Sequence, residues 1–207
     1  PEIKLGLKHF KTMPHNYDRK VQITTMVHVD EAYREILLGD SGYETLTALD
    51  DQLEQKTFYE TKGYSWVKAL PTGDNIYLLS IGDLMGGSAD QKLGKLSYAV
   101  RKEGRYVPRG DALEKLHRPA DMALGDFDGD GKNELVVANF GMATGSVDIH
   151  KLSWNNWKFL PKPHMTLSED PGAVDCEVAD FNADGRPDVA VLFGGARENM
   201  SIFINHG

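Results

Sequence analysis

Short apolar runs alternate with polar, glycine-rich turns along most of the chain, a pattern typical of β-strands joined by short connections. The runs group into four successive units at residues 20–60, 64–108, 118–161 and 173–207. A short helix is expected only at residues 111–117. The sequence therefore predicts an all-β fold built from four similar units.

The first three units each contain four predicted strands, and the fourth contains three. It lacks a counterpart to the last strand of the third unit. The predicted strands lie at residues 21–29, 35–38, 45–49 and 57–59, at 65–70, 76–81, 93–100 and 105–107, at 121–125, 134–139, 147–152 and 157–160, and at 174–179, 188–193 and 201–205.

The first loop (residues 126–134) joins the first two strands of the third unit and reads Asp-Phe-Asp-Gly-Asp-Gly-Lys-Asn-Glu. Its alternating carboxylates can point to one cation if the chain curls past the two glycines. Oxygens at loop positions 1, 3, 5, 7 and 9 suit Ca²⁺, which takes about six to eight oxygen ligands. The predicted ligands are the side chains of Asp126, Asp128, Asp130 and Glu134 and the backbone carbonyl of Lys132.

An ordinary surface turn is the alternative interpretation of this loop, because Asp and Gly are common turn residues. Three alternating aspartates without a counter-ion would repel one another, however. We therefore expect a cation in the first loop.

The second loop (residues 180–188) repeats the pattern in the fourth unit. Asn182 replaces a carboxylate with an amide oxygen, so weaker binding than in the first loop is expected from the lower ligand charge. The predicted ligands are the side chains of Asp180, Asn182, Asp184 and Asp188 and the backbone carbonyl of Arg186. The sequence thus predicts two Ca²⁺ sites.

Each loop is followed by a phenylalanine-glycine segment, Phe140-Gly141-Met142-Ala143 in one unit and Phe193-Gly194-Gly195-Ala196 in the next. With these segments, residues 118–207 resemble the FG-GAP and VCBS repeat family of β-propellers, known from integrin α-subunit heads and bacterial secreted proteins. The resemblance implies four-stranded antiparallel blades around a central channel, with calcium in the loop between the first two strands of a blade. About four blades would then lie in this chain.

Blades bury their apolar faces against neighbours on both sides, so a row of four requires closure or a partner. One solution closes four blades with a strand at residues 5–10 of the N-terminal segment (residues 1–19). The other places the chain in a larger ring of about seven blades, the rest coming from a missing segment or another chain. We favour the larger ring because the fourth unit ends after three strands.

Composition narrows the classes of function. The net charge is -8 and no Lys/Arg run is present, which argues against nucleic-acid binding. No apolar run reaches the roughly 18 residues of a membrane span. The single cysteine, Cys176, excludes an internal disulfide and is expected to pack as a small buried apolar residue. Low-affinity calcium loops favour a secreted, cell-surface or periplasmic location.

These features favour a calcium-stabilised module that binds a protein or glycan ligand and is not itself catalytic. The sequence contains no nucleophile elbow, phosphate-binding loop or zinc-type histidine spacing. The alternative is a propeller domain of a polysaccharide lyase-like enzyme or of an electron-transfer protein, with His117 and Arg118 as candidate ligand contacts. Asp121 and Asp175 occupy the same position in their repeats and are expected to bond neighbouring turns, or else to face a ligand in the channel.

Overall fold

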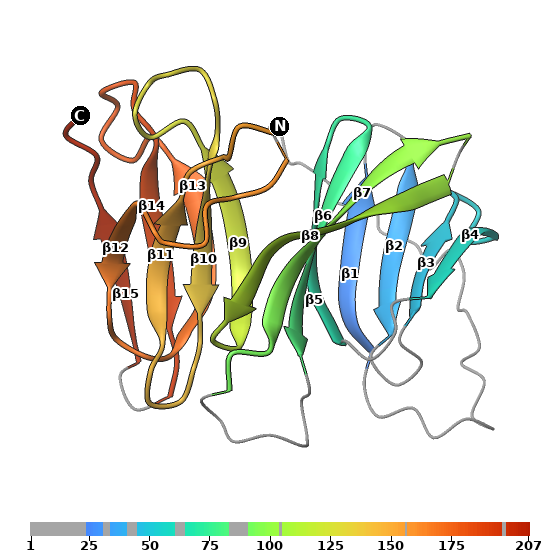
Figure 1. Cartoon of the computed structure of the whole chain (residues 1–207), viewed down its shortest axis with the longest axis horizontal. Coiled ribbons are helices and arrows are strands. Elements are labelled where there is room, and N and C mark those ends of the chain that lie inside the picture. The colour runs from blue at the N-terminus through green and yellow to red at the C-terminus, as the bar shows by residue number, and fades with distance from the viewer. Residues whose placement is uncertain are drawn as a thin grey trace, which may run out of the picture.

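The computed structural model describes residues 24–30, 34–40, 45–60, 65–82, 91–103, 105–155, 157–195 and 198–207. Within these ranges the chain is all-β, with fifteen strands in four antiparallel sheets and no helix (Figure 1). None of the described residues therefore belongs to a helix long and apolar enough to cross a membrane. The expected strand at residues 5–10 and the segment 1–19 lie outside the described residues.

Each sheet is formed by strands that follow one another in the sequence, and the fourth sheet has three strands, as predicted. The first sheet contains β1 (Thr24–Asp30), β2 (Glu35–Asp40), β3 (Thr45–Leu49) and β4 (Gln55–Glu60); the second, β5 (Ser65–Thr72), β6 (Asn75–Gly82), β7 (Gly94–Lys102) and β8 (Arg105–Leu116); the third, β9 (Pro119–Gly125), β10 (Glu134–Asn139), β11 (Ser146–His150) and β12 (Met165–Ser168); and the fourth, β13 (Ala173–Ala179), β14 (Asp188–Phe193) and β15 (Asn199–Phe203).

Two local predictions were wrong, because in both cases the segment packs against strands of the second sheet. Residues 111–117 are not helical, because β8 continues to Leu116 and Leu113 pairs with Leu96 of β7 in the core. Residues 157–160 do not form the fourth strand of the third sheet, which is β12 instead. The Phe159 backbone N–H donates to Ala112 O of β8, so this segment is held by the second sheet.

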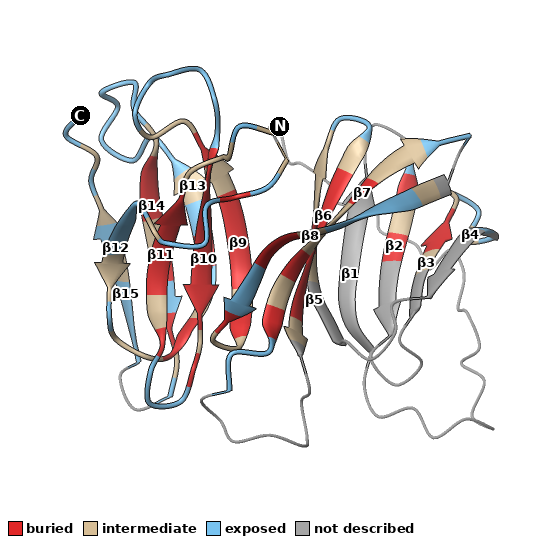
Figure 2. Cartoon of the chain, in the orientation of Figure 1, coloured by how far each residue is buried: buried red, intermediate tan, exposed pale blue. Residues whose placement is uncertain are grey.

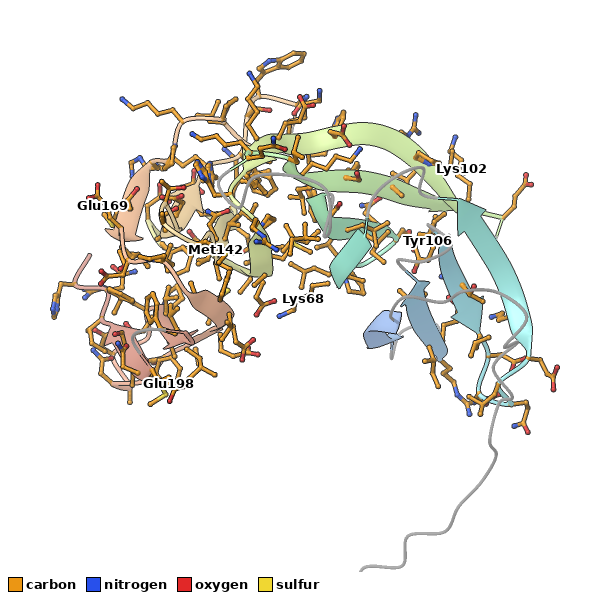
Figure 3. All side chains as sticks on the ribbon, turned by 90° about the horizontal axis from the view of Figure 1, so that it is seen from below. Lys68, Lys102, Tyr106, Met142, Glu169 and Glu198 are labelled. Atoms are coloured by element: carbon orange, nitrogen blue, oxygen red, sulfur yellow. The ribbon has the colours of Figure 1, made fainter. Side chains whose placement is uncertain are left out.

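The sheets follow one another along an arc, with β5 in contact with β1, β9 with β5, and β13 with β9 (Figure 3). Apolar clusters fill the space between consecutive sheets, and buried residues are concentrated in their strands (Figure 2). β10 shows how this works, since all six of its residues are buried. Side chains alternate between the faces of a strand. Leu135 and Val137 therefore pack toward the second sheet, and Val136 and Ala138 toward the fourth.

The first and second sheets are also joined by a buried ion pair. The carboxylate of Glu35, at the start of β2, accepts hydrogen bonds from both terminal nitrogens of Arg101 on β7, at 2.8 and 2.5 Å. Lys56 Nζ lies 2.9 Å from the same carboxylate. Burial alone would raise the pKa of Glu35, but the hydrogen bonds from Arg101 and Lys56 outweigh it and hold this pKa below its ordinary value of 4.5.

Removing the Glu35 carboxylate should strongly destabilise the protein. Glu35→Ala removes the carboxylate that neutralises the partly buried Arg101, which costs about 3–5 kcal/mol in the free energy of unfolding measured by urea denaturation. Since the folded-state pKa of Glu35 is lowered, the contribution of the pair is complete above pH 4.5 and is lost as the pH falls below that value.

The matched control is Asp51→Ala, which breaks the exposed Arg34–Asp51 pair, whose side chains are 77% and 44% exposed. This change should cost less than about 1 kcal/mol. Equal effects of the two substitutions would contradict the structural role given to Glu35.

Candidate metal centre

The first loop gathers three of its predicted ligands into one group. Ligand oxygens of Asp126, Asp128 and Asp130 lie within 4.8 Å of one another, an arrangement that could hold a metal ion. The loop is shaped by its own backbone N–H groups, which donate to the carboxylates. These bonds run from Gly131 N to Asp126 Oδ2 (3.0 Å), Asp130 N to Asp128 Oδ1 (3.1 Å), Lys132 N to Asp130 Oδ1 (2.8 Å) and Phe127 N to Glu134 Oε2 (2.9 Å).

The donor set of the first loop suits a hard cation. Asp126 Oδ1 is buried and has no hydrogen-bond partner among the described residues. A buried carboxylate oxygen is costly unless it is paired or coordinates a metal. Burial also raises the pKa of Glu134, the more so because Asp128 and Asp130 add negative charge nearby. Calcium bound here would supply the positive charge that this group of carboxylates requires.

The second loop repeats four internal hydrogen bonds of the first loop at equivalent positions. This agreement shows that the two loops share one conformation, although Asn182 replaces the second aspartate. The four equivalent bonds run from Gly185 N to Asp180 Oδ2 (2.7 Å), Asp184 N to Asn182 Oδ1 (3.0 Å), Arg186 N to Asp184 Oδ1 (2.9 Å) and Phe181 N to Asp188 Oδ2 (2.9 Å). The second loop also makes two further bonds, from Asp184 N to Asp180 Oδ1 (3.0 Å) and from the Asn182 side-chain amide to Asp184 Oδ2 (3.0 Å).

Both loops need two residues in the left-handed region of the backbone. In the first loop these residues are Gly129 (φ 74°) and Gly131 (φ 83°), and in the second they are Ala183 (φ 62°) and Gly185 (φ 85°). Glycine adopts such angles without strain, whereas a residue with a Cβ has a higher conformational energy there. The second loop therefore keeps the shared conformation at the expense of strain at Ala183.

Sequence analysis missed one charged residue of the first loop's surroundings. Lys151 follows β11, and its Nζ lies 2.5 Å from Asp128 Oδ2. This contact is the main reason why the pKa of Asp128 is lowered. Lys151 offsets one of the carboxylates that give the first loop its extra negative charge. We expected the first loop to bind calcium more tightly than the second because of its greater negative charge. That difference in affinity therefore also depends on Lys151, which lies outside the loop.

The two loops lie at the same end of their sheets as the C terminus (Figure 1). Asn205 connects them, because its backbone N–H donates to Asp188 Oδ1 (2.7 Å) and its side-chain amide to Phe127 O (2.9 Å). Beside this connection is a cavity of about 390 Å³ between the third and fourth sheets. Its lining includes Asp128, Glu134, Lys151, His164 and His206 as well as apolar side chains from both sheets.

Asp121 acts mainly as a link between three sheets. Its Oδ2 accepts the backbone N–H of Cys176 on β13 at 2.9 Å, and its Oδ1 lies 2.5 Å from Lys68 Nζ of β5, which points to the inner side of the arc (Figure 3). Burial, followed by the neighbouring Asp175 carboxyl, raises the pKa of Asp121 to about 6, although Lys68 opposes this shift. Asp175 itself is exposed. Cys176 is buried in the apolar cluster, as predicted.

His117 and Arg118 bind the segment that follows β10. The His117 ring contacts Thr144 Oγ1 at 2.9 Å, and the carbonyls of His117 and Arg118 accept the backbone N–H groups of Gly141 and Phe140. Neither residue lines the cavity described above. Their observed contacts therefore position a turn.

Residues 126–191 match the family model described as FG-GAP-like repeat. The match contains the whole first loop and the whole second loop, so the chain carries an FG-GAP-like repeat in this region, as the sequence resemblance indicated. A search of curated proteins found no match to the chain.

One solved structure supports the fold at low sequence identity. A protein assigned as a 6-phosphogluconolactonase from Bacteroides fragilis NCTC 9343 superposes with a TM-score of 0.55 and 10% identity, over 95% of this chain and 58% of that one. The chain thus spans little more than half the length of this relative in structure. The computationally designed Ika4 protein gives a TM-score of 0.46 and 11% identity, over 96% and 98% of the two chains. At these identities the likeness concerns the fold alone.

Replacing Lys151 should strengthen calcium binding at the first loop. Lys151→Met removes a positive charge next to Asp128, and we expect the affinity of this loop to rise about fivefold, as measured by calorimetry on chelator-treated protein. Lys132→Met is the matched control, because Lys132 Nζ lies 3.8 Å from Asp130 and its side chain is 60% exposed. A larger gain from the control than from Lys151→Met would contradict this role of Lys151.

Relieving the strain at Ala183 should stabilise the second loop. Ala183→Gly is expected to raise the free energy of unfolding by about 0.5–1 kcal/mol, because the left-handed conformation costs alanine more than the added chain entropy of glycine. The reciprocal change Gly129→Ala should lower it by about 1 kcal/mol. No atom lies within 4 Å of a Cβ built at Gly129, so backbone conformation alone is tested. Urea denaturation in the presence of chelator measures the free energy of unfolding of both variants. A lower free energy of unfolding in Ala183→Gly would contradict the proposed strain at Ala183.

Proposed function

We propose that this chain is part of a calcium-stabilised β-propeller that serves as a binding module. The observation that carries the proposal is the group of carboxylate oxygens from Asp126, Asp128 and Asp130 in the first loop. The second loop supports it, because its backbone donates equivalent hydrogen bonds to its own side-chain oxygens. The proposed ligands of the first site are Asp126, Asp128, Asp130, Lys132 O and Glu134. Those of the second are Asp180, Asn182, Asp184, Arg186 O and Asp188.

Calcium in these loops would stabilise the hairpins and take no part in a reaction. Each bound ion would neutralise the carboxylates of its loop and fix the connection between the first two strands of the sheet. At a free calcium concentration about ten times the dissociation constant, each site would add about 1.4 kcal/mol to stability.

A further sheet beyond the fourth would extend the arc toward the proposed ring. In the third sheet, the paired residues Ala138 and Val147 are buried against the fourth sheet. The corresponding pair in the fourth sheet is Leu192 and Met200, which are 48% and 67% exposed. Ile202 on the same strand is 46% exposed. We infer that this apolar face packs against another blade, from an additional segment or another chain, in a ring of about seven blades.

The module is proposed to act in a secreted, cell-surface or periplasmic setting, where calcium is abundant enough for loops of this kind. Its ligand would be a protein or a glycan. A non-catalytic role is supported by His117, one of the two candidate contacts of an enzyme, because its ring is bonded to Thr144 in a turn.

Calorimetric titration of chelator-treated protein with Ca²⁺ tests the proposal, with thermal unfolding followed in parallel. We expect two saturable sites and a higher melting temperature in calcium. Asp128→Ala should abolish one site and Asp184→Ala the other, each leaving its partner intact. Absence of binding heat together with an unchanged melting curve would show that the loops are ordinary turns.

A further inference from the structure

A tryptophan stands almost fully exposed on the connection between β11 and β12. Trp154 is 93% exposed, the highest value among the large hydrophobic residues that the structure describes as exposed. Such a residue leaves a large apolar surface in water, and aromatic side chains of this kind often act as anchors in binding. Trp154 is therefore available as an aromatic anchor for a ligand.

The segment that carries Trp154 is held firmly in place. Ser153 and Leu160 donate backbone hydrogen bonds to Lys158 O (2.7 Å) and Lys151 O (2.8 Å). These bonds pair residues 151–153 with residues 158–160 as the two arms of a hairpin. The Asn155 side chain accepts from Ser153 Oγ (2.5 Å) and from Lys158 N (3.1 Å). An ordered hairpin presents the indole ring at a small further cost in conformational entropy when a ligand binds.

The second sheet supports the hairpin from behind. Trp157 stacks on Tyr98 of β7 with ring centroids 5.2 Å apart, and its backbone carbonyl accepts the Tyr77 hydroxyl at 3.0 Å. Phe159 is buried and donates its backbone N–H to Ala112 O of β8 at 2.9 Å. Trp157 and Phe159 thus fix the base of the hairpin, whereas Trp154 on the same hairpin has no such role.

Exposed cations lie on the segment of Trp154 and on the neighbouring part of β8, in a protein whose net charge is -8. Residues 151–164 contain three lysines and no acidic residue. On β8, Arg109 precedes the section that contacts this segment, and Asp111 in that section pairs with Lys95. Lys158 Nζ lies 5.0 Å from the Trp157 ring centre, and Lys158, Lys162 and Arg109 are exposed. Trp154, Lys158, Lys162 and Arg109 together are called the Trp154 surface below.

We propose that the Trp154 surface binds an acidic glycan, that is, a polysaccharide whose sugar rings carry carboxylates or sulfates. The C–H face of a sugar ring would lie on the indole of Trp154, and the exposed cations would pair with the anionic substituents. This inference rests on the proposed function as a binding module and specifies its ligand.

A small repeating ligand fits this surface better than a folded protein does. Stable protein interfaces bury about 800 Å² on each partner around an apolar centre of several side chains. Trp154 is flanked by Ser153 and Asn155 and offers a single exposed ring. One exposed ring, with Lys158 paired to the adjacent Ser153 through the backbone, matches one sugar unit and its charge.

Calorimetric titration with defined oligosaccharides tests the inference. The probes are an oligogalacturonate hexamer, which carries carboxylates, a heparin hexasaccharide, which adds sulfates, and neutral maltohexaose. We expect at least one acidic probe to bind and maltohexaose not to bind. Trp154→Ala should weaken the acidic probe at least tenfold, and Lys158→Gln about threefold. The preference between the two acidic probes identifies the substituent.

Two matched variants control for general effects. Met142→Ala removes another exposed apolar side chain, 60% exposed, and Lys92→Gln removes an exposed lysine outside the Trp154 surface. Both should bind the acidic probe as the unmodified protein does. All four variants should keep its melting temperature, because exposed side chains contribute little to folding stability.

Several results would overturn the assignment. They are no binding of either acidic probe, equal binding by Trp154→Ala and Met142→Ala, or equally tight Trp154-dependent binding of oligothymidylate or of a poly-glutamate peptide. The calcium titration of the first and second loops involves none of these residues. A failure here is therefore distinguishable from a failure of the calcium proposal.

Discussion

Three of the four sheets begin their second strand with a buried carboxylate, and much of the structure depends on how each charge is stabilised. Glu35, Glu134 and Asp188 are 1%, 3% and 0% exposed. A buried charge is costly unless it is paired. In the third and fourth sheets the carboxylate accepts a backbone N–H of the preceding loop, from Phe127 or Phe181, beside the other oxygens of the candidate calcium site. In the first sheet, cationic side chains from β4 and β7 take this role and join the first two sheets.

The first and second loops are thus one way to stabilise a buried carboxylate at the start of a second strand, and the Glu35–Arg101 pair is another. The two arrangements differ in what they stabilise. The Arg101 pair connects two sheets and needs no added ion. A loop that binds calcium would instead stabilise a connection within one sheet and make its stability depend on the calcium concentration. The first loop shares one feature with the Glu35–Arg101 pair, because the Lys151 side chain pairs with its Asp128 carboxylate.

The same packing that joins the sheets also creates the exposed Trp154 surface. Trp157 and Phe159 leave the third sheet to pack against the second, so the segment between β11 and β12 becomes a fixed hairpin. The first and second loops and the hairpin are built from different residues, although Lys151 lies at the base of the hairpin and contacts the first loop. In the proposed module, calcium would therefore support a scaffold whose ligand contacts lie elsewhere.

The sequence by itself determined most of the strands, their grouping into four units and the two loops, but not β12. These features arise from local rules, namely alternation within a strand and the turn chemistry of Asp and Gly. Tertiary structure alone decided the pairing of Glu35 with Arg101, 66 residues apart, and of Lys151 with Asp128, 23 residues apart. It also decided that residues 111–116 continue a strand and that residues 157–160 pack on the neighbouring sheet. Such contacts form between sheets, and their free energy depends on side chains that no local pattern brings together.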